Sequence, residues 1–254
     1  MTNLEGRIVL RHRIKAPPDG VWTDNQVLKA LADRLGYGRH FTANARETFE
    51  ELRRATAGAA ADYSGITYER IDADDGVFWP CPSPDHPGTP RLFLDRFGTE
   101  DGRARFHAVD HRPPAETPDG LFPYFLTTGR ILMQYNSGTQ TRRNAELREA
   151  APEPFVEIHP ETAQTHGIGD SDLVTLTTRR GRAVMKARLT RDIRFDTLFV
   201  PFHWGAAGSA NALTIGALDP VSRIPEFKVC AVQVEKIVAP IETSLDPFKP
   251  SYLN

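Results

Sequence analysis

The second half of the chain alternates apolar and polar residues with a period of two, which is typical of half-buried β-strands. The turn Arg179-Arg180-Gly181 favours a hairpin, and Pro160 favours the start of a short helix that Gly167 ends. About six short strands with few helical turns predict a small barrel rather than an open sheet. The predicted strands are 124–128, 155–158, 172–178, 183–190, 197–201 and 228–234.

The first half of the chain has a different pattern. A short strand is predicted at 7–11 and helices at 24–35 and 45–56, the first with Asp24 as its N-cap and a four-residue apolar stripe (27, 28, 31 and 35). Residues 57–120 are rich in Gly, Pro, Asp and Arg, and their apolar positions lack periodicity, although 91–94 and 103–107 have the composition of short strands.

These patterns divide the chain into four parts. Residues 1–115 form a mixed α+β segment, and the proline-rich stretch that ends in 116–121 serves as a linker. The mainly β region then covers 122–236, and 237–254 form a C-terminal tail.

Composition excludes several classes of protein. Lys plus Arg number 31 and Asp plus Glu number 33, for a net charge of -2, so no basic excess points to nucleic acid. The longest apolar run, 229–232, has four residues, whereas a membrane helix needs roughly 20. The two cysteines, Cys81 and Cys230, stand too far apart to form a CxxC pair or an iron–sulfur run, which favours a reducing cytoplasm.

Two donor-rich loops after the strand at 124–128 are the first candidate site. Gly129 permits a close backbone approach, Thr128 offers a hydroxyl and Arg130 a guanidinium, and residues 137–143 add hydroxyls and two cations. Such loops suit a pyrophosphate. An ordinary solvated loop is the alternative on spacing alone, and neither the Walker pattern nor GxGxxG occurs.

The second candidate is the run from Phe202 to Asn211, whose aromatic, histidine and amide groups suit a heterocycle. A hydrogen-bonded core histidine is the alternative for His203, and a snorkelling side chain is the alternative for Lys228. No second His or Cys stands at ligand spacing beside His203, so no protein metal site is predicted.

Together these motifs resemble the C-terminal domain of molybdopterin oxidoreductases. The matching runs are TTGR at 127–130, YNSGTQTRR at 135–143, PEPFVEI at 152–158, VPFH at 200–203, NALT at 211–214 and PEFKVCAV at 225–232. Residues 1–115 resemble the family's preceding segment through NLEGR at 3–7, GVFWPCP at 76–82 and DGRARF at 101–106. Within the family, the run 134–143 resembles assimilatory nitrate reductases most, with formate dehydrogenases as the close competitor.

The resemblance implies a double-psi β-barrel of the formate dehydrogenase/DMSO reductase family over 122–236. It implies that this barrel binds molybdopterin guanine dinucleotide, two copies of which chelate molybdenum (Mo-bis-MGD). It assigns Phe202 to the substrate side and no residue to catalysis. The implied cofactor contacts are Thr128, Gly129, Arg130, Ile131, Gln134, Tyr135, Asn136, Ser137, Thr139, Thr141, His203, Asn211 and Lys228.

This chain departs from the family in length and in its cysteines. Members are much longer, with an N-terminal cysteine run that binds a 4Fe-4S cluster and usually a cysteine on molybdenum. We therefore expect the C-terminal portion of such an enzyme, cytoplasmic and inactive alone, with the cluster in a remaining N-terminal portion or a partner chain. We expect the whole enzyme to reduce nitrate to nitrite. A formate dehydrogenase-like subunit, a stand-alone pterin-binding module and an inactive fragment are the alternatives.

The missing portion implies an exposed apolar surface on this chain. The predicted members of that surface are Leu10, Phe78, Trp79 and Phe106.

Overall fold

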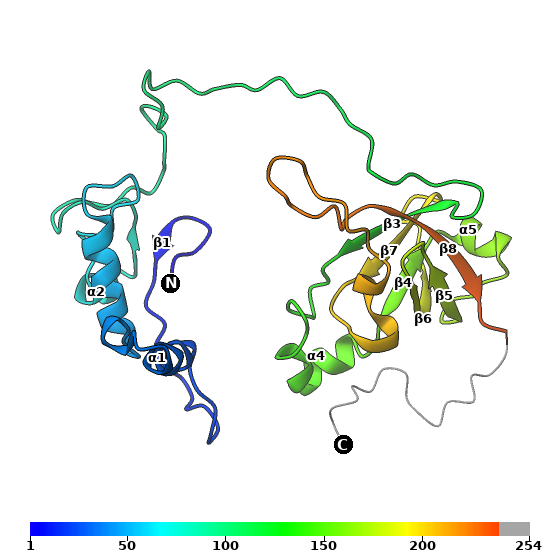
Figure 1. Ribbon diagram of the computed structural model, residues 1–254, viewed down its shortest axis with the longest axis horizontal. Helices are drawn as coiled ribbons and strands as arrows, with labels where there is room; N and C mark the ends of the chain where they lie inside the picture. Colours follow the sequence, from blue (N-terminus) through cyan, green and yellow to red (C-terminus); the bar gives the residue numbers. More distant parts are fainter. Residues whose placement is uncertain (239–254) are drawn as a thin grey trace. The chain divides into compact units, whose positions relative to one another are not determined.

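The computed structural model describes residues 1–238 and divides the chain into two compact units. The first is Met1–Ala108 and the second begins at Val109 (Figure 1). Residues 116–121, predicted as a linker, therefore group with the second unit. Within the described residues, no helix has the length and apolar character needed to cross a membrane. Most of the predicted tail, 239–254, lies outside the described residues.

The first unit contains three α-helices and a two-stranded antiparallel sheet. In chain order these are β1 (Arg7–Ile8), α1 (Asp24–Arg34), a 3-10 turn η1 (Gly38–His40), α2 (Ala45–Thr56), α3 (Tyr68–Ala73) and β2 (Val77–Phe78). Its core is a small cluster of Ile8, Ile66, Ile71, Val77 and Cys81.

Several local expectations for this unit need correction, and the strand predicted at 7–11 is confined to Arg7–Ile8. Thr23, not Asp24, caps α1: its hydroxyl accepts the Gln26 N–H, and the Gln26 amide accepts the Thr23 N–H in return. Residues 91–94 and 103–107 form no strand, because their few apolar side chains are largely exposed and no neighbouring strand pairs with them. The six-residue helix α3 was not predicted, because it is too short for an apolar period to be visible.

The exposed apolar surface of this unit lies mainly on α1. Val27, Leu28 and Leu31 are each about half exposed, and Leu35 follows them on the same stripe. Of the predicted surface residues, Phe106 is exposed, whereas Leu10 and Trp79 pack partly against the small core. The apolar stripe of this helix was identified in the sequence. Periodicity alone, however, does not show whether such a stripe is buried against another element or exposed.

The second unit is a closed six-stranded barrel (Figure 1). Its strands run in the spatial order β3-β7-β4-β6-β5-β8, so every strand has two neighbours and the barrel has no free edge. The pairs β3–β7 and β4–β6 are parallel, and the remaining four pairs are antiparallel. The strands are β3 (Tyr124–Gly129), β4 (Phe155–Ile158), β5 (Leu173–Thr177), β6 (Arg182–Leu189), β7 (Thr197–Pro201) and β8 (Cys230–Lys236).

Short helical segments connect these strands. They are η2 (Thr141–Arg143), α4 (Ala145–Ala150), α5 (Pro160–Thr165), η3 (Ala206–Gly208) and η4 (Ala210–Ala212). His159 caps α5, and Pro160 takes its first position as predicted. The six-residue α4 was not predicted, for the same reason of length as α3.

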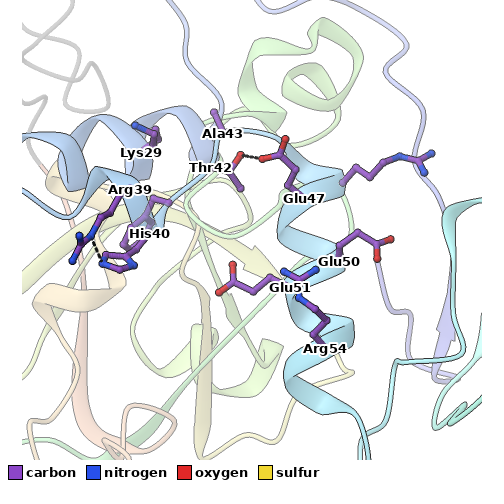
Figure 2. A pocket seen from close by; sticks show the side chains of 11 residues that line it. Lys29, Arg39, His40, Thr42, Ala43, Glu47, Glu50, Glu51 and Arg54 are labelled. Carbon is purple, nitrogen blue, oxygen red and sulfur yellow. Dashed lines mark hydrogen bonds between the residues drawn. The ribbon is translucent and has the colours of Figure 1, made fainter.

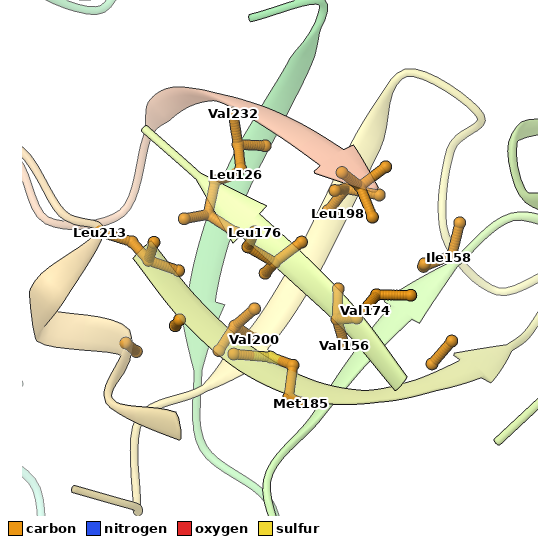
Figure 3. Packing of buried hydrophobic residues seen from close by; sticks show 14 of the residues in the cluster. Leu126, Val156, Ile158, Val174, Leu176, Met185, Leu198, Val200, Leu213 and Val232 are labelled. Carbon is orange, nitrogen blue, oxygen red and sulfur yellow. The ribbon is translucent and has the colours of Figure 1, made fainter. Parts of the chain in front are cut away.

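The barrel core follows from the period-two pattern. Along β6, Ala183, Met185 and Ala187 are buried while the residues between them are partly exposed. Figure 3 shows how Leu126, Leu176 and other apolar side chains from different strands meet inside the barrel. Truncating such a fully buried leucine to alanine costs about 2–5 kcal/mol. The barrel is therefore a rigid support for the loops that leave its ends.

Candidate functional site

The parallel pairing of β3 with β7 brings the predicted loops together. Gly129 lies opposite Pro201 in the register, so the two strands end at the same edge of the barrel. The loop after β3, residues 130–140, and the loop after β7, residues 202–214, therefore begin side by side. Long donor-rich loops at the end of a rigid barrel are typical of binding sites.

Buried His203 joins these two loops. Its side chain is only 1% exposed, its Nε2 accepts the Ile131 N–H at 2.9 Å, and its Nδ1 donates to the Asn136 carbonyl at 2.5 Å. A backbone N–H only donates and a carbonyl only accepts, so the ring is neutral with its proton on Nδ1. Both ring nitrogens thus bind the backbone of the loop after β3.

Gln134 and Thr141 are also committed to contacts within that loop. The Gln134 amide donates to the Ala151 carbonyl at 3.1 Å, and its oxygen accepts the Thr141 hydroxyl at 2.6 Å. The same hydroxyl accepts the Tyr135 N–H. These two predicted contact residues therefore fix the shape of the loop from inside.

Arg142, which is not among the predicted contact residues, links the loop to β7. Its two terminal nitrogens donate to the carbonyl of His203 at 2.6 Å and to the carbonyl of Ser137 at 2.9 Å. Gly138 has a φ of +70°, and a Cβ there would lie 2.3 Å from Arg142 Nη1. The only sequence signal for this contact is a cation that follows a loop glycine.

The side chains that remain available line the outside of the loop. Arg130, Tyr135, Asn136, Ser137 and Thr139 are exposed, and the hydroxyls of the last two lie 2.9 Å apart. Asn136 has a φ of +48°, a conformation that asparagine tolerates better than most residues. The predicted contacts thus divide into buried groups that hold the loop and exposed groups that face solvent.

Two cations meet at the Phe202 ring on this edge. The Arg130 guanidinium lies 5.4 Å and the Lys228 ammonium 5.7 Å from the ring centroid. Lys228 also donates to the Thr128 carbonyl at 2.7 Å, and the Thr128 hydroxyl donates to the Phe227 carbonyl. Among residues 1–238, no carboxylate forms an ion pair with either cation. Positive charge is therefore free to bind an anion here.

A cavity of about 810 Å³ adjoins Lys228. Its walls come from residues 112–115 and 217–229, which contribute mostly apolar and proline side chains together with the carboxylates of Asp219 and Glu226. Cations beside an apolar cavity suit a ligand that combines phosphates with a heterocycle. A dinucleotide is such a ligand, so the residues present fit one.

Gly129 also has a packing reason to lack a side chain. Its φ is not positive, and a Cβ there would lie 2.5 Å from the Phe199 ring. The glycine therefore lets an aromatic ring pack against the end of β3.

Asn211 is exposed on η4, and the β5–β6 turn binds Leu213, two residues further along the chain. The Leu213 carbonyl accepts the Thr178 hydroxyl at 3.0 Å and two guanidinium nitrogens of Arg180. The Cys230 thiol faces the same carbonyl at 3.5 Å, and burial raises the pKa of this thiol to about 11. The turn thereby fixes the loop that carries Asn211.

A separate cavity of about 610 Å³ lies in the first unit, beside α1, η1 and α2 (Figure 2). Glu47 accepts the Thr42 hydroxyl and Arg39 donates to His40. Lys29 forms an ion pair with Asp33. Because much of its charge is already paired, this cavity is the weaker candidate. No group of three or more His, Cys, Asp or Glu in the described part of the chain is arranged to hold a metal.

Comparisons with known proteins show what the chain is similar to. The family model described as "Molydopterin dinucleotide binding domain" matches residues 124–231. The assimilatory nitrate reductase catalytic subunit of Bacillus subtilis is 44% identical over 237 residues, covering 92% of this chain and 33% of that protein. The F420-dependent formate dehydrogenase subunit alpha of Methanocaldococcus jannaschii is also 44% identical over 237 residues, covering 93% and 34%.

The fold is shared with a solved structure, acetylene hydratase from Pelobacter acetylenicus. The TM-score is 0.60 at 18% identity, over 89% of this chain and 34% of that one. The chain spans about a third of the length of the curated relatives it matches. It carries a molybdopterin dinucleotide-binding domain and is homologous, over most of its length, to assimilatory nitrate reductase and formate dehydrogenase catalytic subunits.

Proposed function

We propose that this chain supplies the dinucleotide-binding portion of a molybdenum oxidoreductase and that its ligand is molybdopterin guanine dinucleotide. The observation that carries the proposal is the meeting of Arg130 and Lys228 at Phe202, beside the 810 Å³ cavity. We further propose the double-psi topology for the barrel, which the two parallel strand pairs support.

In this proposal each group of side chains has a distinct task. Arg130 and Lys228 bind phosphate oxygens, and the exposed hydroxyls of Ser137 and Thr139 donate to the same anion. The exposed ring of Tyr135 offers a face for a heterocycle. The bound group supplies the redox chemistry, while this chain supplies binding, orientation and electrostatics.

For the assembled enzyme we propose reduction of nitrate to nitrite. The 44% identity to an assimilatory nitrate reductase supports this choice. Formate oxidation is the second candidate, since a formate dehydrogenase subunit is equally identical over the same length. Nitrate-dependent oxidation of a reduced viologen by the assembled enzyme supports the first, and formate-dependent reduction of the oxidised dye supports the second.

We also propose that the first unit packs against the remainder of the catalytic polypeptide, either joined to this chain or separate. Relatives have about twice as much further sequence as this chain covers, and the apolar stripe of α1 is exposed here. That remainder would hold the 4Fe-4S cluster. The proposed location is the cytoplasm, which cell fractionation tests.

A pair of variants tests the role of the α1 stripe. Leu28→Glu with Leu31→Glu should abolish co-purification of the cluster-bearing polypeptide and leave the unfolding midpoint of this chain nearly unchanged, because both side chains are about half exposed. Glu51→Gln with Arg54→Gln, on exposed positions of α2, is the matched control. Unchanged co-purification of the cluster-bearing polypeptide with the Leu28→Glu, Leu31→Glu double variant would contradict the proposed surface.

The test of the dinucleotide itself is its content in the purified protein. The chain is isolated anaerobically from a host that makes the cofactor, and molybdenum, pterin and released guanine nucleotide are quantified against protein. We expect pterin and guanine nucleotide in equal amounts, and loss of both in the Arg130→Met, Lys228→Met double variant. Pterin without guanine nucleotide would refute the guanine form, and absence of both would refute the proposal.

A further inference from the structure

We propose that His203 is a positioning residue that holds the loop after β3 in its binding shape and does not itself contact the ligand. This inference rests on the proposed dinucleotide site, but it concerns a contact within the chain that is measurable without any ligand. His203 stands at the end of β7, while the loop that it holds leaves from β3.

Neither ring nitrogen of His203 is free. Nε2 accepts from Ile131 and Nδ1 donates to Asn136, with a side chain that is 1% exposed. The neighbouring rings of Phe202 and Trp204 lie 4.9 Å and 6.0 Å from the imidazole centroid, so the ring is packed as well as hydrogen-bonded. A ligand could bind the imidazole only by displacing a backbone group that the buried ring already bonds, which is unfavourable.

The two contacts of the His203 ring hold both ends of one short segment. Residues 132–135 lie between the two bonded positions, and Leu132 and Tyr135 are largely exposed to solvent, whereas Met133 is mostly covered. Fixing both ends reduces the number of backbone conformations available before the ligand arrives, which increases affinity.

Arg142 adds a further link between His203 and the loop after β3. It donates to the carbonyl of His203 and to that of Ser137, the residue after Asn136. His203 is therefore bound to the loop through its ring and, by way of Arg142, through its backbone. The bond needs the neutral Nδ1–H tautomer, because a ring with a proton on Nε2 cannot accept from Ile131.

A ligand-free experiment on the intact chain tests the tautomer and the contact. The 15N shifts of the His203 ring at neutral pH should report a protonated Nδ1 and an unprotonated Nε2. An Nε2–H or doubly protonated ring would overturn the proposal, and this measurement needs no variant to fold.

Three substitutions separate the two ring contacts. Gln places its amide near the Nε2 position and Asn places it near Nδ1, whereas Phe keeps a ring and removes both contacts. In His203→Asn and His203→Phe, amide exchange of Ile131 should accelerate roughly 10- to 100-fold, while His203→Gln should retain most of its protection. Equal exchange in the Asn and Gln variants would overturn the proposal.

The control is His166→Asn, because His166 bonds the Tyr124 hydroxyl where β3 begins, away from the loop. This variant should leave exchange of residues 131–137 unchanged. Dinucleotide affinity should fall about tenfold in His203→Asn and less in His203→Gln. If the wild-type chain binds no dinucleotide, the proposed function fails, while the tautomer and exchange results still decide the role of His203.

Discussion

At the scale of single residues, Arg130 and Lys228 illustrate how charge becomes available for a ligand. Both stand at the Phe202 ring, and neither forms an ion pair with a carboxylate among residues 1–238. A charge-assisted hydrogen bond to phosphate contributes about 1.5–3 kcal/mol. Each cation is therefore expected to matter more for binding than for folding.

We predict that Arg130→Met and Lys228→Met each weaken dinucleotide binding roughly 10- to 100-fold. The unfolding midpoint should change little in Arg130→Met and fall slightly in Lys228→Met, which also loses the bond to the Thr128 carbonyl. Isothermal titration at low and high salt measures the effect, and the loss should shrink as salt rises. Arg191→Met removes an exposed cation of the same unit and should leave affinity unchanged. A similar loss of affinity in Arg191→Met would show that the dinucleotide is held by general attraction to positive charge and not by the cations at Phe202.

Cys230 gives a second prediction at this scale. Burial raises the pKa of its thiol to about 11, so the unfolded thiol ionises at lower pH than the folded one. The contribution of this group to stability is thus full below about pH 9 and is lost as pH rises toward 11. The stability advantage of wild type over Cys230→Ala should fall by about 1 kcal/mol between pH 8 and pH 10.

Urea unfolding of wild type and Cys230→Ala at pH 8 and pH 10 measures this difference in the free energy of unfolding. The contributions of other titrating groups cancel, because both proteins carry those groups. A difference that stays constant or grows with pH would show that the folded thiol ionises normally.

At the scale of elements, the β5–β6 turn connects the segment before the barrel to the loop that carries Asn211. Glu116, with a side chain that is only 9% exposed, accepts from both Arg179 and Arg180. Arg180 also donates to the Leu213 carbonyl. One turn therefore orders two neighbouring segments.

We predict that Glu116→Gln destabilises the second unit by roughly 1–3 kcal/mol, because it leaves two guanidinium groups without their shared partner. Arg194→Gln breaks an exposed ion pair with Asp196 and should change stability by less than about 0.5 kcal/mol. Urea midpoints measure both. Equal effects of the two variants would mean that the Glu116 contacts contribute no more than a surface pair.

At the scale of the whole molecule, the barrel was predictable where periodicity is regular. The strands β4 and β7 have the predicted bounds, because each is a short run rich in apolar residues that turn residues bound. Strand order was not derivable from this pattern, since pairing depends on contacts between distant residues. The six-residue helices α3 and α4 were too short to give a period.

Contacts between distant residues also decide the candidate site, and the sequence pattern does not give them. The loop residues were identified from their chemistry and from the family resemblance, but their division into buried and exposed groups required the structure. For His203 the residues left two interpretations open, and the observed contacts are those of a hydrogen-bonded, buried histidine. The meeting of Arg130 and Lys228 depends on the barrel register that joins β3 to β8.

The most direct test of the central claim is an amide-exchange map of the chain with and without molybdopterin guanine dinucleotide. We expect protection to increase in the loops at the proposed site, residues 130–137, 202–213 and 226–229, and to stay unchanged around the α1–α2 cavity of the first unit. Protection confined to that cavity, or none anywhere in the chain, would contradict the central claim.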